Sequence, residues 1–419
     1  MESDEKPLEG ETFSADTDAS PSRTASPGPT AKQREWAEKT DKILEACKWR
    51  DLEAIRNYAT SEDGLISDEV RRLAWPILLG CSNGDDETKG SKESWRALPR
   101  HGDEDQVALD VNRSFIYYPN NQTSKEMAAR KEELSDLIIE VLRRNPYLCY
   151  FQGYHDICQV LLLVLSPQDR TPSVARLSAL RIRDFMLPNL SPALAQLRLI
   201  PSIITTVNPR LCTHLSQTQP FFALSGTLTM YAHDIQEYGQ IARLFDVLLA
   251  REAVFSVYMF AQIVLQRSAE LFETPADEPE MLHSILSKLP QPLDLESIIS
   301  KTVQLFNDHP PESLRSWSSI SASSVLKTAR WSEQVVNQTL GDGERFFAQQ
   351  VKELEWAAKR EEILKMLWKY RRPAKAVGVA VLVGIISFVL NRQGYVPRIL
   401  GFGHAFWRYW GSEGNGKRY

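Results

Sequence analysis

The sequence of 419 residues lacks the common motifs by which a protein holds a nucleotide or a catalytic metal. Without a G-x-x-x-x-G-K-[ST] segment, the chain cannot bind a nucleotide through a P-loop. H-E-x-x-H and G-x-S-x-G are also missing, which removes the common zinc-protease and serine-hydrolase signatures. The seven histidines are dispersed, and only His155 stands beside a notable motif. We interpret His155 as a structural histidine rather than a base.

Cysteine is scarce and has no spacing suited to zinc or redox chemistry. The odd number predicts free thiols in a reducing compartment, at Cys47, Cys81, Cys149, Cys158 and Cys212. Residues 1–32 contain no apolar core and are not expected to act as a secretory signal. We therefore expect the bulk of the protein to lie in the cytosol.

The chain has no excess of positive charge, because its formal net charge is -5. Nucleic acid is not an expected partner, since binding it normally requires a basic face. The hydrophobic fraction of 43% and the charged fraction of 25% are those of a globular protein with a sizeable core. This length allows one large domain with appendages.

Strand-like alternation is scarce from Trp36 onward, which predicts an all-α fold. The clearest helix covers 131–144, where apolar residues recur at helical spacing until Asn145 and Pro146 end the pattern. These apolar residues are Leu134, Leu137, Ile138, Val141 and Leu142. We also expect a deeply buried helix starting near Gly153 and another over 295–306.

The two ends of the chain differ from this body in composition. Residues 1–32 are rich in Ser, Thr, Pro and Asp, which predicts a disordered tail. Phosphorylation of Ser22, Thr24 or Ser26 there is an alternative to a tail without function. Residues 311–372 are predicted to form a helical connector after a domain over 33–310, solvated rather than a dedicated partner site.

No apolar run reaches the roughly 20 residues of a typical membrane-spanning helix. The longest, 376–390, has 15 residues without a charge and is flanked by basic residues. We predict a short transmembrane anchor over 373–391, with a buried core helix or a membrane hairpin as alternatives. Residues 392–419 would form a tail, with an interfacial helix whose apolar face carries Ile399, Phe402, Phe406, Trp407 and Trp410.

Two short segments are candidates for chemistry. In the first, Val-Ala-Leu-Asp-Val-Asn-Arg-Ser over 107–114, Asp110 and Arg113 stand one helical turn apart. In the second, Tyr-Phe-Gln-Gly-Tyr-His-Asp over 150–156, Gln152 precedes Gly153 at the start of a helix. Taken singly, the first segment is better interpreted as an exposed ion pair and the second as a turn between two helices.

In this order and at this separation, the two segments resemble the first two signature motifs of TBC domains, I-x-x-D-x-x-R-[TS] and Y-x-Q-G. The resemblance covers about residues 60–310. Gly64 and Leu65 through Arg71, Arg72, Trp75 and Pro76 resemble the opening of that domain, and Arg243 through Asp246 its R-x-[WFY]-D element. The third motif departs from the pattern, because Gly226 stands where a Trp is usual.

The resemblance implies a GTPase-activating protein for a Rab-family GTPase. Arg113 would be an arginine finger and Gln152 a glutamine finger, both acting in trans. Asp110, Tyr150, Gly153 and Asp156 would support them. GTP and Mg²⁺ would belong to the partner, so no cofactor of its own is implied.

The segment 150–156 and the apolar run are most similar to the TBC proteins anchored in the endoplasmic reticulum. This similarity implies an endoplasmic reticulum or early Golgi membrane, with the TBC domain in the cytosol, and a role in early secretory traffic. The alternatives are a catalytically weak Rab-binding scaffold, a membrane tether, or a membrane-shaping protein that uses its C-terminal region.

Overall fold

The structure, a computed structural model, describes residues 30–81, 94–120 and 122–392. These residues form helices and turns with no strand among them, which confirms the predicted all-α class. All five cysteines are free thiols, as predicted. The tails predicted at 1–32 and 392–419, with Ser22, Thr24 and Ser26, lie almost wholly outside the described residues.

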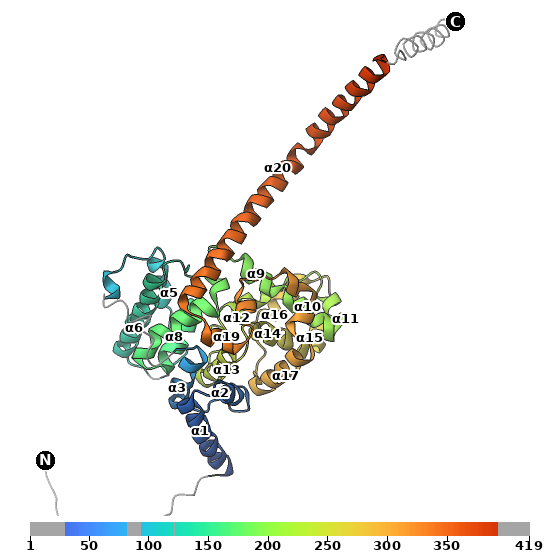
Figure 1. The fold of residues 1–419 in the computed structure, drawn as a ribbon. Helices are drawn as coiled ribbons and strands as arrows, with labels where there is room; N and C mark the ends of the chain where they lie inside the picture. The colour runs from blue at the N-terminus through green and yellow to red at the C-terminus, as the bar shows by residue number, and fades with distance from the viewer. Residues whose placement is uncertain (1–29, 82–93, 121, 393–419) are drawn as a thin grey trace, which may run out of the picture.

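Most helices gather into one body, from which a long C-terminal helix projects (Figure 1). The first part of the body contains α1 (Ala31–Trp49), α2 (Leu52–Thr60), α3 (Asp68–Leu78), α5 (Glu104–Val111), α6 (Ser124–Arg144), α7 (Tyr154–Val164) and α8 (Pro167–Leu180). The second part contains α9 (Ser191–Leu197), α10 (Leu199–Val207), α11 (Pro209–His214), α12 (Leu224–Leu228), α13 (Tyr238–Ala250), α14 (Phe255–Gln266), α15 (Ser268–Glu273), α16 (Pro279–Leu286) and α17 (Leu295–Asp308). The last described helices are α18 (Val325–Thr328), α19 (Ser332–Asn337) and α20 (Leu340–Arg392).

Helix α6 illustrates how local sequence sets the boundaries of these elements. It begins with a capping box, in which the Thr123 side chain accepts from the Glu126 backbone N–H and the Glu126 side chain accepts from Thr123. The predicted apolar stripe from Leu134 to Leu142 is buried. The helix ends before Asn145, as the following proline requires.

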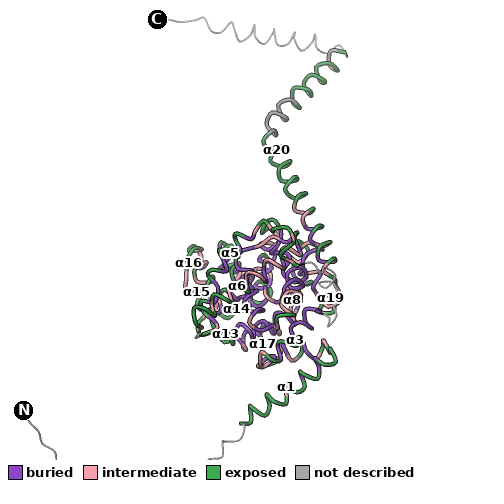
Figure 2. The backbone as a smooth tube through the Cα atoms, turned by 90° about the vertical axis from the view of Figure 1, so that its left-hand side faces the viewer, coloured by how far each residue is buried: buried purple, intermediate pink, exposed green. Residues whose placement is uncertain are grey.

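The buried core is continuous from Ile43 in α1 to Phe347 in α20 (Figure 2). Helix α7 lies inside it with nearly every side chain buried, as its apolar sequence predicts. On the other side of the body, α14 packs against both α10 and α17. The predicted helix over 295–306 is confirmed as α17, which extends to Asp308.

A buried carboxylate joins the start of the body to α13. The Asp246 side chain is fully buried and accepts from the Arg71 Nε at 3.0 Å, the Trp75 Nε1 at 2.9 Å and the Leu65 backbone N–H at 3.1 Å. Gly64 has a φ of +53°, and a Cβ there would lie 2.6 Å from the Asp246 Oδ2. The motif residues at 64–76 and at 243–246 therefore form one structural clamp, which holds α3 against α13.

The first turns of α20 are packed on the body rather than free. Gln350 is buried, and it accepts from the Arg183 Nε at 2.9 Å and donates to the Asp184 Oδ1 at 2.8 Å. Arg183 and Asp184 belong to a 3₁₀ turn, Arg183–Phe185, that follows α8. A Cβ on Gly343 would lie 2.9 Å from the Ala179 Cβ, so a glycine lets the two helices approach closely.

Replacing Gln350 with alanine is expected to lower the free energy of unfolding by about 1–3 kcal/mol, because the buried Arg183 Nε loses its acceptor and Asp184 loses one of its donors. The neighbouring change Gln349→Ala is the matched control, since Gln349 is exposed and, within the described part of the chain, its side chain hydrogen-bonds only to Glu353, at 3.4 Å. Urea unfolding of the full chain measures both. Equal stabilities for the two variants would contradict the docking role of Gln350.

Beyond its packed turns, α20 continues as an exposed helix that leads away from the body (Figures 1 and 2). With 53 residues it is about 80 Å long. Across residues 30–81, 94–120 and 122–392, no helix is long and apolar enough to cross a membrane. The structure therefore does not bear out the predicted transmembrane anchor over 373–391. The physical reason is length, because the charge-free run covers only about 22 Å of a hydrocarbon core of about 30 Å.

Candidate functional site

Arg113 extends into solvent from the end of α5. Asp110, in the last turn of that helix, is 1% exposed, whereas the Arg113 side chain is 66% exposed. The Arg113 Nη2 lies 3.9 Å from the Asp110 Oδ1. The ion pair suggested by the spacing is therefore a long contact, which orients the guanidinium but leaves its donors available to another molecule.

Gln152 is exposed in the turn between α6 and α7. No hydrogen bond of its side chain is found among the residues that the structure describes. Gly153 caps α7 with a φ of +100°, and a Cβ there would lie 2.6 Å from the Thr229 Cγ2. Only glycine fits this turn without strain. The close packing of Gly153 therefore fixes the backbone position of the neighbouring Gln152.

The two exposed side chains open onto one pocket of about 510 Å³, which we call the Arg113–Gln152 pocket. It is bounded by the end of α5, the segment that follows it, the start of α7 and the turn after α12. Five of the six predicted site residues line it: Asp110, Arg113, Gln152, Gly153 and Asp156. The structure thus brings together two segments that are separate in the sequence.

Tyr150, the sixth predicted residue, lies behind the pocket and joins its two sides. Its hydroxyl donates to the Asp110 Oδ2 at 3.0 Å, and its backbone N–H donates to the Asp103 Oδ2 at 2.9 Å. Burial, reinforced by the Asp110 carboxylate, raises the pKa of Tyr150. The phenol therefore keeps its proton and remains a donor at neutral pH, so the turn that carries Gln152 is attached to the helix that carries Arg113.

Two histidines extend this polar chain across the pocket, and sequence reasoning assigned neither of them to the site. The His155 Nδ1 lies 3.3 Å from the Tyr150 hydroxyl, and its Nε2 lies 3.3 Å from the Asp156 Oδ1. The His233 Nδ1 lies 3.1 Å from the other oxygen of Asp156. Burial lowers the pKa of His155, whereas the hydrogen bond to Asp156 raises the pKa of His233. No spacing in the sequence indicates that His233 faces Asp156.

Gly226 lies where two aromatic rings already fill the space. A Cβ at this position would lie 3.2 Å from the Tyr231 ring and 3.3 Å from the Phe260 ring. Those two rings stack with centroids 6.3 Å apart. A tryptophan could not be accommodated without moving them, so Tyr231 and Phe260 supply the packing that a larger residue at 226 would supply.

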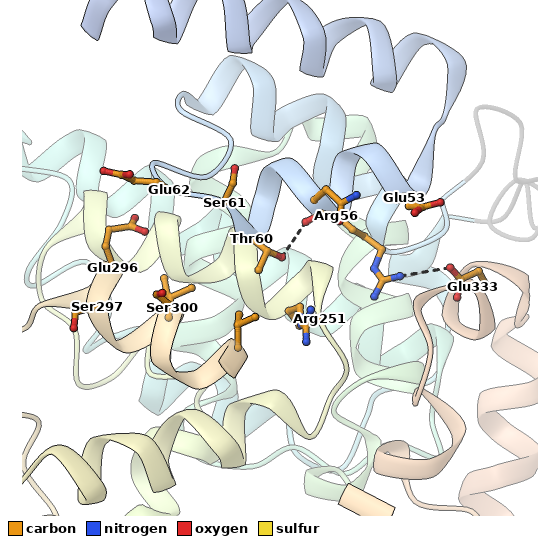
Figure 3. Close-up of a pocket in the computed structure, with 13 residues that line it drawn as sticks. Glu53, Arg56, Thr60, Ser61, Glu62, Arg251, Glu296, Ser297, Ser300 and Glu333 are labelled. Carbon is orange, nitrogen blue, oxygen red and sulfur yellow. Dashed lines mark hydrogen bonds and ion pairs between the residues drawn. The ribbon is translucent and has the colours of Figure 1, made fainter. Parts of the chain in front are cut away.

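A larger pocket, of about 980 Å³, lies elsewhere on the body (Figure 3). It contains none of the predicted site residues. The close-up shows Arg56 directed toward Glu333, 3.5 Å away, while Glu296 at the opposite side pairs with Arg243. Its lining carries four glutamates and two arginines, so it is acidic on balance. The smaller pocket therefore remains the candidate site, because it alone collects the exposed Arg113 and Gln152.

The sequence of this chain is similar to those of known proteins. Residues 68–272 match the sequence profile of the Rab-GTPase-TBC domain. TBC1 domain family member 20 of Bos taurus is 37% identical over 266 residues, which cover 63% of this chain and 65% of that protein. The chain thus spans a little under two thirds of the length of this relative. The crystal structure of the Ypt/Rab-GAP domain of Gyp1p superposes with a TM-score of 0.49 at 15% identity, covering 60% of this chain and 92% of that one.

A fission-yeast protein aligns over more of its own length. GTPase-activating protein gyp10 of Schizosaccharomyces pombe is 32% identical over 293 residues, which cover 68% of this chain and 76% of that protein. The chain belongs to the Rab-GTPase-TBC domain family.

Proposed function

We propose that this protein is a GTPase-activating protein, which stimulates GTP hydrolysis by a Rab-family GTPase through residues supplied in trans. One observation carries the proposal: Arg113 and Gln152 are both exposed at the same pocket, although they come from different elements. Family membership supports it, as does the similarity to the GTPase-activating protein gyp10 of fission yeast. A partner that brings its own GTP and Mg²⁺ accounts for the lack of a P-loop in this chain.

Small GTPases hydrolyse GTP slowly because the charge on the transferring phosphoryl group is poorly stabilised and the attacking water is poorly positioned. In our proposal the Arg113 guanidinium donates to the phosphate oxygens as charge develops on them. Gln152 orients the water, in place of a glutamine of the GTPase. Asp110, Tyr150, Gly153 and Asp156 hold these two side chains at the required separation.

The direct test is single-turnover GTP hydrolysis across a panel of Rab proteins, with the full chain added in catalytic amounts. For at least one Rab, we expect the bound GTP to be hydrolysed on the order of 10³-fold faster than at the intrinsic rate of that Rab. The alternative function is a Rab-binding scaffold. It is favoured only by the glycine at position 226, where the motif has a tryptophan, and the space beside this glycine is filled by the rings of Tyr231 and Phe260. A Rab that binds the protein tightly without faster hydrolysis would establish the scaffold instead.

Replacing Gly153 with alanine is expected to lower kcat about 10- to 100-fold with a smaller effect on Rab binding. The reason is geometric: the added Cβ meets Thr229 and the φ of +100° disfavours any L residue, so Gln152 is displaced. Gly239→Ala is the matched control, because the nearest atom to a Cβ there is 4.0 Å away. If both variants hydrolyse GTP at the wild-type rate, the turn does not position Gln152.

We also propose that residues 373–391 associate with an endoplasmic reticulum or early Golgi membrane, with the TBC domain in the cytosol, and that residues 311–372 connect the two. This location would place the activity in early secretory traffic. Large apolar side chains exposed on the last turns of α20 support it: Val379, Val381, Leu382, Val383, Ile385, Ile386, Phe388 and Val389. Deleting residues 373–419 should release the protein from membranes in cell fractionation while GTPase activation in solution is retained.

A further inference from the structure

The side chains behind the Arg113–Gln152 pocket contain one proton too few to satisfy every contact when His155 is neutral. The Tyr150 hydroxyl has a single proton, and two acceptors compete for it: the Asp110 Oδ2 at 3.0 Å and the His155 Nδ1 at 3.3 Å. On the far side of the imidazole, the Nε2 faces an Asp156 oxygen at 3.3 Å. Both ring nitrogens therefore lie beside oxygens that can accept a hydrogen bond.

Each neutral tautomer of His155 leaves one of these contacts unfavourable. With the proton on Nδ1, the ring donates to the Tyr150 oxygen, but the lone pair of Nε2 then faces the Asp156 carboxylate. With the proton on Nε2, the ring has to accept the phenol proton at Nδ1, and Tyr150 no longer donates to Asp110. In that second tautomer the side-chain link between the Gln152 turn and the Arg113 helix is broken, and only the backbone contact of Tyr150 to Asp103 remains.

The imidazolium satisfies both sides at once. It donates from Nδ1 to the Tyr150 oxygen, leaves the phenol proton for Asp110, and presents Nε2–H to Asp156. We propose that His155 is a positioning residue, which gains a proton when a triphosphate docks at the pocket and thereby joins the glutamine turn to the arginine helix. This inference rests on the proposed GTPase-activating function.

The charges around His155 explain why the proton would arrive only with the partner. Burial lowers the pKa of His155, and the cations of Arg113 and of His233 act in the same direction. Asp110 on α5 and Asp156 on α7 oppose them. A docked triphosphate would bring several negative charges to Arg113, which removes part of its repulsion of the imidazolium. Docking and protonation should therefore favour each other, as linked equilibria require.

The proposal is tested by the pH dependence of single-turnover GTP hydrolysis, measured between pH 6 and pH 8 with the full chain in excess over the Rab that the panel selects. The intrinsic rate of that Rab is subtracted at each pH. The wild-type kcat should fall about tenfold per pH unit on the alkaline side of the titration. Both His155→Gln and Tyr150→Phe should have a lower kcat at pH 6 and lose this dependence. The affinity of the wild type for the GTP-bound Rab should also weaken as the pH rises, because binding is linked to proton uptake. The double variant should lose no more than the single ones, because the two residues act as one link.

Proton uptake on binding gives a second readout, which a merely structural role for His155 would not change. The same Rab, loaded with a non-hydrolysable GTP analogue, is mixed with the protein in weak buffer containing a pH indicator. Wild type should take up close to one proton more than His155→Gln at neutral pH. His283→Gln is the matched control, since His283 lies on α16 outside the pocket, and it should behave as wild type.

The outcomes separate this inference from the function on which it rests. If His155→Gln keeps the wild-type pH profile and proton uptake while Arg113→Ala is inactive, the positioning role is wrong and the proposed function stands. If Arg113→Ala is fully active, the proposed function fails, and this inference fails with it. Thermal unfolding of each variant excludes a loss of fold as the cause of a lower rate.

Discussion

Replacing Arg113 with alanine is expected to lower the stimulated rate of GTP hydrolysis by at least about 100-fold, within the range for a lost arginine finger. The side chain is 66% exposed, and among the described residues its only ion pair is the 3.9 Å approach to Asp110. Its removal should therefore leave the fold intact. Because the interaction is proposed to strengthen only as charge develops on the phosphate, kcat should fall while the affinity for the GTP-bound Rab changes little.

Arg210→Ala is the control for this prediction, because Arg210 is an exposed arginine on α11 outside the pocket. It should activate the Rab as well as wild type does. Arg113→Lys is a sharper variant, since lysine keeps the charge but lacks the planar fork that matches phosphate oxygens. Activity of Arg113→Lys close to wild type would mean that the site needs only a positive charge. Unchanged turnover in both Arg113→Ala and Gln152→Ala would rule out the mechanism.

Gln152→Ala should also reduce the rate of GTP hydrolysis. The reason is that the attacking water loses the side chain proposed to orient it, not that a charge is removed. Its side chain has no hydrogen bond to hold it among the described residues, so it is free to meet a water in the complex. A double variant of Arg113 and Gln152 distinguishes two cases. If the two side chains act on one transition state as a unit, their effects should be less than additive.

Helices were predictable wherever the apolar period was undisturbed. The stripe from Leu134 to Leu142, the deep helix after Gly153 and the helix from Leu295 all have patterns that burial on one face explains. The packing between helices was not predictable from such local patterns. The sequence shows only that Gly226 departs from a motif, whereas the structure shows that the Tyr231 and Phe260 rings occupy the neighbouring volume.

The candidate site was predictable only in part, because its residues meet through tertiary contacts. Asp110 and Arg113 are close in the sequence, and the family motif indicated Gln152. The contact between His233 and Asp156 joins positions 77 residues apart, and no local period encodes it. The docking of Gln350 on Arg183 is likewise a long-range contact, made by a polar residue in a segment whose sequence suggested only a solvated helix.

Replacing Asp246 with alanine is expected to destabilise the protein by about 3–5 kcal/mol, the usual cost of removing one partner of a buried ion pair. The carboxylate is fully buried and accepts from three groups, the Arg71 guanidinium, the Trp75 indole and the Leu65 backbone. Burial raises the pKa of Asp246, and the guanidinium of Arg71 opposes that rise. Without the carboxylate, Arg71 would keep a buried positive charge with only Asp68 as partner, at 2.9 Å.

Asp136→Ala is the matched control, because Asp136 pairs with Arg96 at the surface, where both side chains are at least 40% exposed. An exposed pair of this kind contributes about 0–1 kcal/mol. Urea unfolding followed by circular dichroism should therefore separate the two variants by a clear shift in midpoint.

Because α3 and α13 carry no residue of the Arg113–Gln152 pocket, Asp246→Ala that remains folded at low temperature should still activate the Rab. A loss of activity without a loss of stability would mean that the clamp contributes to the site as well as to the fold.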